Sequence, residues 1–145
     1  MGEVKKRDLT TQELFIMLET REGFEQALSR RCAITTPDTP VYMAELLQQH
    51  GLTVPQVAER SQISRSYVYQ VYNGTRNPSR NALLRMALAM ELSLRETQRL
   101  LLVAQKGELY PRVRRDAAII YCLNHGLAVA QADEMLGELQ EPLLL

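Results

Sequence analysis

Two short helical segments joined by a tight turn, within residues 52–79, constrain the fold of this chain more than any other feature. Thr53 and Ser64 are each placed to N-cap a helix, because a hydroxyl oxygen accepts hydrogen bonds from first-turn N–H groups. Gln62-Ile63 is the predicted turn between the two helices. The second helix carries apolar residues at helical spacing, which predicts one buried face: Val68, Val71 and Tyr72. Asn73-Gly74 is expected to end it in left-handed geometry.

A helix, a tight turn and a second helix with a polar, basic face are typical of helix-turn-helix DNA readers. The segment resembles the Cro/repressor (XRE-like) helix-turn-helix family. The matching residues are Leu52, Thr53, Ala58, Glu59, Ile63, Ser64, Arg65, Ser66, Val68, Val71, Asn73, Gly74, Arg76, Asn77, Pro78 and Ser79. The resemblance implies a five-helix, lambda-repressor-like domain from about Thr39 to Gln105, hence an all-α fold. It also implies binding to double-stranded DNA.

The resemblance assigns site residues along and just after the second helix. Those expected to face the bases in the major groove are Arg65, Ser66, Tyr69 and Gln70. Those expected beside the sugar-phosphate backbone are Asn73, Arg76 and Asn77. The chemistry of the first set fits, because arginine bonds bidentately to guanine, glutamine to adenine, and serine to either. Two plainer interpretations stay open: Asn73 is a left-handed helix cap, and Gln70 is a solvated helix position.

Two positions depart from the family pattern. Family members often have glycine in the turn, where this chain has Gln62, and a non-glycine residue holds a positive φ at modest cost. They often place a phosphate-binding glutamine at the start of the first helix, where this chain has Val54 followed by Pro55. Valine cannot bond a phosphate, so backbone N–H groups are the remaining phosphate donors at this helix end.

The chain of 145 residues is predicted to be helical throughout and to consist of three segments. We predict an N-terminal helical extension over residues 1–36 and a helix-turn-helix DNA-binding domain over residues 37–106. Residues 107–145 form a C-terminal helical extension that is a possible dimerisation element.

Local signals place the ends of the helices outside the motif. A capping box from Thr10 to Glu13 opens the first helix, and a second helix runs from about Arg21 to Cys32. The stretch Thr35–Pro40 interrupts the helical pattern and is the predicted linker. Pro111 is predicted to begin a helix, because proline suits the first helical turn.

The net charge of zero counts against a strongly electrostatic nucleic-acid binder, but the charges are unevenly distributed. Residues 53–80 contain four arginines and one acid, a balance of +3, whereas residues 105–145 have a balance of −2. The arginines of the first stretch are Arg60, Arg65, Arg76 and Arg80. The positive excess coincides with the motif, as phosphate neutralisation requires. The further arginines Arg112, Arg114 and Arg115 are interpreted as a solvated helix face.

No other chemistry stands out. Cys32 and Cys122 lie in no CxxC or Cys/His cluster, so we expect reduced thiols and no metal. His50 and His125 each precede a glycine near a predicted helix C-terminus, where a cation is favoured. We expect neither catalysis nor a cofactor, because no phosphate loop or nucleophile–base arrangement is evident. With no signal-like apolar segment and no membrane-length apolar run, we expect a cytoplasmic protein without a membrane partner.

These observations predict sequence-specific DNA binding by a prokaryotic or phage-type transcriptional regulator that is not an enzyme. The alternative is a protein-binding adaptor or antitoxin-like module on the same fold. It rests on the three tyrosines crowded into the second helix, Tyr67, Tyr69 and Tyr72, because an exposed aromatic cluster on a helix can equally be a protein-binding surface. Of the three, Tyr72 is expected to pack in the core.

A single copy with a +3 patch is expected to bind weakly, which favours a homodimer on a palindromic site. The apolar stripes of the two extensions are the candidate interfaces, and the C-terminal stripe is preferred. The alternative is that both extensions fold back and enlarge the core of the monomer.

Overall fold

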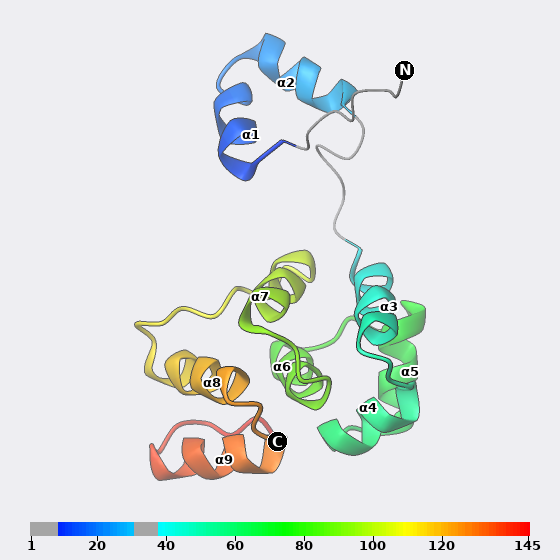
Figure 1. Ribbon diagram of the computed structural model, residues 1–145, viewed down its shortest axis with the longest axis vertical. Coiled ribbons are helices and arrows are strands. Elements are labelled where there is room, and N and C mark those ends of the chain that lie inside the picture. The colour runs from blue at the N-terminus through cyan, green and yellow to red at the C-terminus, as the bar shows by residue number, and fades with distance from the viewer. Residues whose placement is uncertain (1–8, 31–37) are drawn as a thin grey trace, which may run out of the picture. The chain divides into compact units, whose positions relative to one another are not determined.

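The computed structural model describes residues 9–30 and 38–145, and every regular element in those residues is an α-helix (Figure 1). The helices are α1 (Thr11–Met17), α2 (Arg21–Ser29), α3 (Thr39–Gln49), α4 (Val54–Ser61), α5 (Arg65–Asn73), α6 (Arg80–Ala89), α7 (Leu94–Val103), α8 (Arg114–Asn124) and α9 (Val129–Glu138). The predicted all-α fold class is confirmed. None of these helices is long and apolar enough to cross a membrane. The chain divides into two compact units, Met1–Pro37 and Asp38–Leu145.

The N-terminal unit contains a hairpin of α1 and α2. The predicted capping box is present, because the Glu13 N–H donates to Thr10 Oγ1 (3.1 Å) and the Thr10 N–H donates to Glu13 Oε2 (3.0 Å). Gly23 lets α2 approach α1 closely, since a Cβ at this position would clash with the Met17 carbonyl group. Besides Gly23, only Ala27 is buried in α2. Large apolar side chains of the hairpin stay exposed: Phe15, Ile16, Leu18, Phe24 and Leu28.

α2 is shorter than predicted. It ends at Ser29, and Arg30 already has an extended backbone (φ −83°, ψ 128°), whereas the predicted helix continued to Cys32. Cys32 and the first half of the predicted linker Thr35–Pro40 lie outside the described residues. The end of that linker belongs to α3, which has Pro40 in its first turn as predicted.

α6 is the central helix of the second unit. It contacts α4, α7, α8 and α9, and Figure 1 shows it between the helix-turn-helix on one side and the C-terminal helices on the other. Seven of its ten residues are buried: Ala82, Leu83, Leu84, Met86, Ala87, Leu88 and Ala89. A helix that is apolar on nearly all sides needs neighbours on nearly all sides. The composition of α6 therefore requires that both groups of helices pack around it.

The C-terminal helices complete this core. The apolar residues that they bury are Ala118, Ile119, Cys122 and Leu123 from α8, and Val129, Ala132 and Leu136 from α9. These side chains form one cluster with those of α4, α5 and α6. Part of the C-terminal apolar stripe therefore folds back and enlarges the monomer's core, whereas Val113 and Tyr121 stay exposed (47% and 48%).

α8 begins at Arg114, so the prediction that Pro111 begins this helix is wrong. The buried carboxylate of Asp116 gives the reason: it pairs with Arg80 (Nη2 to Oδ2, 3.1 Å) and accepts the Tyr110 N–H (3.0 Å). These bonds hold the preceding residues in a turn, which the Val113 N–H closes on the Tyr110 carbonyl oxygen (3.0 Å). Pro111 lies within that turn.

The segment after α9 is fixed by two buried or half-buried charged residues. Asp133 accepts the N–H groups of Leu144 (2.6 Å) and Leu145 (3.1 Å). Arg115 donates through Nε to the Pro142 carbonyl oxygen (2.9 Å) and through Nη2 to that of Leu143 (3.3 Å). Arg115 was predicted to lie on a solvated face, but it is a half-buried structural residue; Arg112 and Arg114 are exposed as predicted.

Both histidines lie at helix C-termini, as predicted. His50 caps α3 with its Nε2 3.0 Å from Glu96 Oε2. His125 caps α8, and its ring centroid lies 4.2 Å from that of Tyr121. In each case the following glycine has a φ of 62°, the left-handed conformation that glycine favours.

Asp116→Asn should destabilise the second unit by about 2 kcal/mol, because it removes the charge that Arg80 faces at a buried site. Burial alone would raise the pKa of Asp116, but hydrogen bonds from Arg80 and Tyr110 hold it below its usual value. The unfolded chain therefore binds the proton at a higher pH than the folded chain does. The stabilisation is present at neutral pH and is lost as the pH falls below about 4 and through the folded-state pKa.

Urea unfolding followed by circular dichroism, from about pH 7 to about pH 3, measures both effects. Glu134→Gln, at an exposed position of α9, is the matched control and should leave the acid sensitivity unchanged. If Asp116→Asn loses stability with acid as steeply as the wild type, this ion pair is not the source of the sensitivity.

Candidate nucleic-acid interface

α4 and α5 form the predicted helix, turn and helix. Thr53 Oγ1 and Ser64 Oγ each accept a first-turn backbone N–H, at 3.4 and 3.2 Å, so both predicted N-caps are confirmed. Gln62 lies in the turn with left-handed geometry (φ 60°, ψ 31°). Gly74, also left-handed (φ 82°, ψ 6°), ends α5. The motif therefore has its predicted local geometry, with a non-glycine residue in the turn.

Arg85 of α6 fixes this turn, a contact that the sequence analysis missed. Its Nε donates to the Ser61 carbonyl oxygen (3.0 Å), and its Nη2 donates to the Gln62 carbonyl oxygen (2.5 Å). These carbonyl groups lie at the C-terminal end of α4, where a cation is favoured. Burial lowers the pKa of Arg85. No local pattern signals the contact, because Arg85 lies 23 and 24 residues along the chain from its partners.

α5 has a buried face and an accessible face. Val68 and Val71 are buried, and Tyr72 is half-buried with its hydroxyl 3.3 Å from the Met90 sulfur. The accessible face carries the residues predicted to face the bases. Arg65, Ser66 and Tyr69 are exposed, and Gln70 is half-buried. The face that a DNA groove would meet is therefore polar and open.

The loop after α5 is ordered by its own side chains. Asn73 Oδ1 accepts the N–H (3.0 Å) and the hydroxyl (2.7 Å) of Thr75. Asn73 is the last residue of α5, and the left-handed cap that the plainer interpretation gave to it is Gly74 instead. The Asn73 side chain orders the loop through Thr75. Its amide nitrogen takes no part in these two bonds, and both Asn73 and Asn77 are exposed.

Arg76 folds back onto α5. Its Nε donates to Gln70 Oε1 (2.7 Å), and its guanidinium carbon lies 4.7 Å from the centroid of the Tyr67 ring. The Tyr67 hydroxyl in turn accepts the Ser79 N–H (3.1 Å). The structure therefore joins Gln70, which was predicted to face the bases, to Arg76, which was predicted to face the DNA backbone. Tyr67, to which no DNA contact was assigned, supports the pair.

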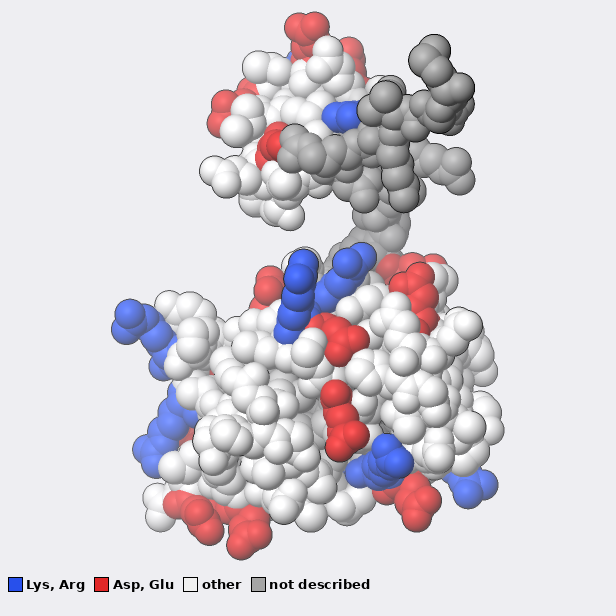
Figure 2. All heavy atoms as spheres, in the orientation of Figure 1, with Lys and Arg blue, Asp and Glu red and all other residues white. Residues whose placement is uncertain are grey.

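The free positive charge near the motif is smaller than the sequence count indicated. Arg80 pairs with Asp116 and donates to the carbonyl oxygens of Gly107 (3.0 Å) and Glu108 (3.1 Å). The arginines of the motif that remain exposed are Arg60, Arg65 and Arg76. On the face of the second unit drawn in Figure 2, basic and acidic side chains are interspersed. We therefore expect weak non-specific attraction to DNA phosphates.

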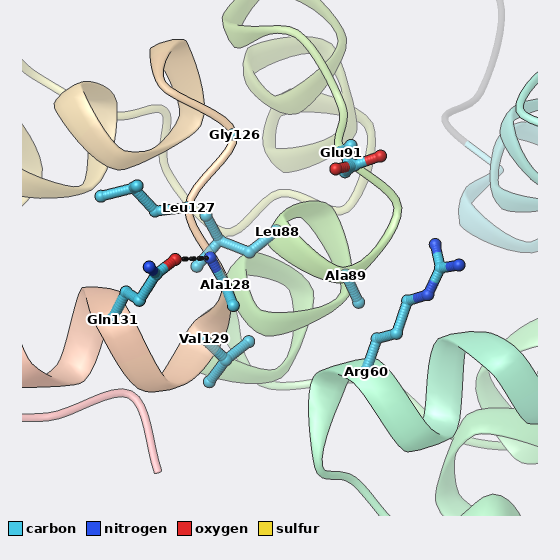
Figure 3. A pocket seen from close by; sticks show the side chains of 9 residues that line it. All are labelled: Arg60, Leu88, Ala89, Glu91, Gly126, Leu127, Ala128, Val129 and Gln131. Atoms are coloured by element: carbon cyan, nitrogen blue, oxygen red, sulfur yellow. Dashed lines mark hydrogen bonds between the residues drawn. The ribbon is translucent and has the colours of Figure 1, made fainter.

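A pocket of about 320 Å³ lies between α4, the end of α6 and the turn from α8 to α9 (Figure 3). It is lined by Arg60, Leu88, Ala89, Glu91, Gly126, Leu127, Ala128, Val129 and Gln131. Gln131 is engaged at the start of α9, where its Oε1 accepts the Ala128 N–H (2.8 Å). The lining contains no nucleophile–base pair. Nowhere in the described part of the chain do three or more His, Cys, Asp or Glu residues form a possible metal site.

Residues 43–96 match the family model described as Helix-turn-helix. The match includes all of α4, α5 and α6 and extends into α3 and α7. The second unit thus contains the fold of a class of DNA-binding regulators. Residues 43–96 belong to the Cro/repressor-like (XRE-like) helix-turn-helix family, as the sequence analysis predicted. No curated protein and no solved structure matched the chain.

Arg85→Ala should lower the free energy of unfolding by about 1–3 kcal/mol, because two carbonyl groups of the turn lose a charged donor. Hydrogen exchange at the turn should accelerate, most clearly at the Ile63 N–H, which donates to the Ala58 carbonyl oxygen (3.2 Å). Urea unfolding and amide exchange measure the two effects. The control is Arg60→Ala, which removes the same charge from an exposed position of α4. Equal stability and exchange in the two variants would show that Arg85 does not hold the turn.

Proposed function

We propose that this protein binds double-stranded DNA sequence-specifically and acts as a transcriptional regulator of prokaryotic or phage type. The observation that carries the proposal is the exposed polar face of α5, the second helix of the helix-turn-helix. The major groove of B-DNA admits an α-helix, and each base pair presents a distinct pattern of donors and acceptors there. Regulation would follow from blocking or recruiting other proteins on the DNA, without catalysis, in the cytoplasm.

Each site residue has a proposed role that suits its chemistry and exposure. The residues proposed to contact bases are Arg65, Ser66, Tyr69 and Gln70, and those proposed to contact the DNA backbone are Asn73, Arg76 and Asn77. Arg65 stands in the first turn of α5, where an extended guanidinium suits a guanine edge. The loop residues follow the left-handed end of α5, which places them beside the same helix end.

The second candidate function is that of a protein-binding adaptor or antitoxin-like module. It is favoured by the exposed apolar side chains of α1 and α2, of which Phe15 is 70% and Ile16 is 60% exposed. An apolar surface of this kind commonly meets another protein. The two functions are compatible in one chain, because these residues lie in the N-terminal unit and the helix-turn-helix lies in the second.

We also propose that the protein binds DNA as a homodimer, with half-sites about 34 Å apart. Part of the C-terminal stripe is buried within the monomer. The exposed candidates from the two extensions are the apolar residues of α1 and α2 and, in the C-terminal extension, Val113 and Tyr121 (47% and 48% exposed). Light scattering on the full chain at micromolar concentration should give the mass of a dimer, and Ile16→Glu should reduce it. A monomeric wild-type protein that binds a single half-site tightly would contradict this proposal.

Arg65→Ala should weaken binding to the preferred DNA site by about 1–3 kcal/mol and relax the preference at one base position. The preferred site is found by selecting bound sequences from a random DNA pool, and affinities are then measured by fluorescence anisotropy. The control is Arg95→Ala, which removes an exposed arginine in the first turn of α7 and should leave the preference unchanged.

Different results would contradict DNA-specific binding and the role of Arg65. A wild-type protein that selects no sequence from the pool would contradict DNA-specific binding itself. An Arg65→Ala variant with wild-type affinity and preference would contradict only the role of Arg65.

A further inference from the structure

We propose that Arg76 sets the base preference of the proposed DNA site by fixing the orientation of the Gln70 side-chain amide. Held in this way, Gln70 presents its NH₂ group to a base, which favours guanine over adenine at that position. The inference rests on the proposed function. It gives a specificity-determining role to a residue that the family resemblance places at the DNA backbone.

The contact between the two side chains defines which end of the amide faces Arg76. Arg76 Nε lies 2.7 Å from Gln70 Oε1. A guanidinium group has only donors, so the neighbouring amide atom must be the oxygen, the acceptor. The NH₂ group of Gln70 is then left for another partner. The backbone strengthens the link, because the Arg76 N–H donates to the Gln70 carbonyl oxygen (3.2 Å).

Arg76 is itself held in place from a second side. Its guanidinium carbon lies 4.7 Å from the centroid of the Tyr67 ring, within the range of a cation–π interaction. The Tyr67 hydroxyl accepts the Ser79 N–H (3.1 Å), which ties the ring to the start of α6. The arginine is therefore positioned by α5 and by the segment that leads into α6, before any DNA binds.

The orientation of the amide decides which base it suits. Guanine presents two acceptors in the major groove, O6 and N7, whereas cytosine presents the N4 amino donor. Bidentate recognition of adenine needs the glutamine oxygen to accept from the adenine N6 amino group. With one of its two lone pairs engaged by the charged donor Arg76, the oxygen could do so only with the N6 amino group beside that cation, which weakens the adenine contact. A free glutamine would favour adenine. A glutamine held by Arg76 is expected to favour guanine and to reject cytosine.

Selection from a random DNA pool tests this inference on the full chain with four variants. Gln70→Ala identifies the base position that Gln70 contacts. At that position the wild type should prefer guanine over adenine by roughly tenfold, within the range for one side chain at a base edge. Arg76→Ala should move the ratio towards adenine by about fivefold or more, in addition to a general loss of affinity. The double variant should match Gln70→Ala in preference, because Arg76 acts through Gln70, and Arg95→Ala is the charge-matched control.

Two results would overturn the inference while leaving the proposed function intact. One is a wild-type preference for adenine at the Gln70 position. The other is an Arg76→Ala variant that binds every sequence more weakly by the same factor and keeps the guanine preference.

Nuclear magnetic resonance on the DNA-free protein gives a separate readout. The Arg76 Nε–H should exchange with water more slowly than the Nε–H of exposed Arg95, and Gln70→Ala should abolish the difference. Equal exchange rates in the wild type would show that the pair does not form. Failure of the wild type to select any DNA would instead contradict the proposed function.

Discussion

The burial of α6 is the constraint on which the second unit depends. Four large side chains of this helix are buried, Leu83, Leu84, Met86 and Leu88. Each contributes about 1.5–3 kcal/mol when it leaves water, so together they contribute about as much as the net stability of a whole domain, about 5–15 kcal/mol. The helix-turn-helix covers one side of α6 and the C-terminal helices cover the other. Neither group alone would keep these side chains from water.

The burial of α6 also requires that its polar residues have hydrogen-bond or ion-pair partners. A charge near a buried helix is tolerated only where it has a partner. Arg80 forms an ion pair with Asp116 in the first turn of α8, and Asn81 accepts a hydrogen bond from Arg115 (3.0 Å). Arg85 donates hydrogen bonds to the turn between α4 and α5. The helix that forms the core therefore also fixes the turn of the DNA-binding motif and the entry to the C-terminal helices. Residues 107–145 are in this sense part of the structural support of the motif.

Local signals in the sequence predicted a large part of this architecture, because caps and turns depend on atoms only a few residues apart. The caps at Thr10, Thr53 and Ser64 and the left-handed conformation of Gln62 are of this kind. The start of α8 was misplaced because Asp116 is satisfied by Arg80, 36 residues away. In the candidate site, the accessible face of α5 followed from the positions of the buried valines. The contact of Arg76 with Gln70 did not, since the loop after α5 has no periodic pattern that would indicate where its side chains turn.

Not all the arginines near the helix-turn-helix are available to DNA phosphates, and this changes how DNA recognition would have to work here. Arg80 and Arg85 are engaged in structural contacts, so the attraction to phosphates is modest and discrimination must come from well-placed polar groups. The loop supplies such groups in an ordered form, with Asn73 bonded to Thr75 and Arg76 bonded to Gln70. Side chains that are already ordered lose less conformational entropy on binding, by about 0.5–1.5 kcal/mol for each one. Contacts within the protein would thus compensate in part for the modest positive charge around the motif.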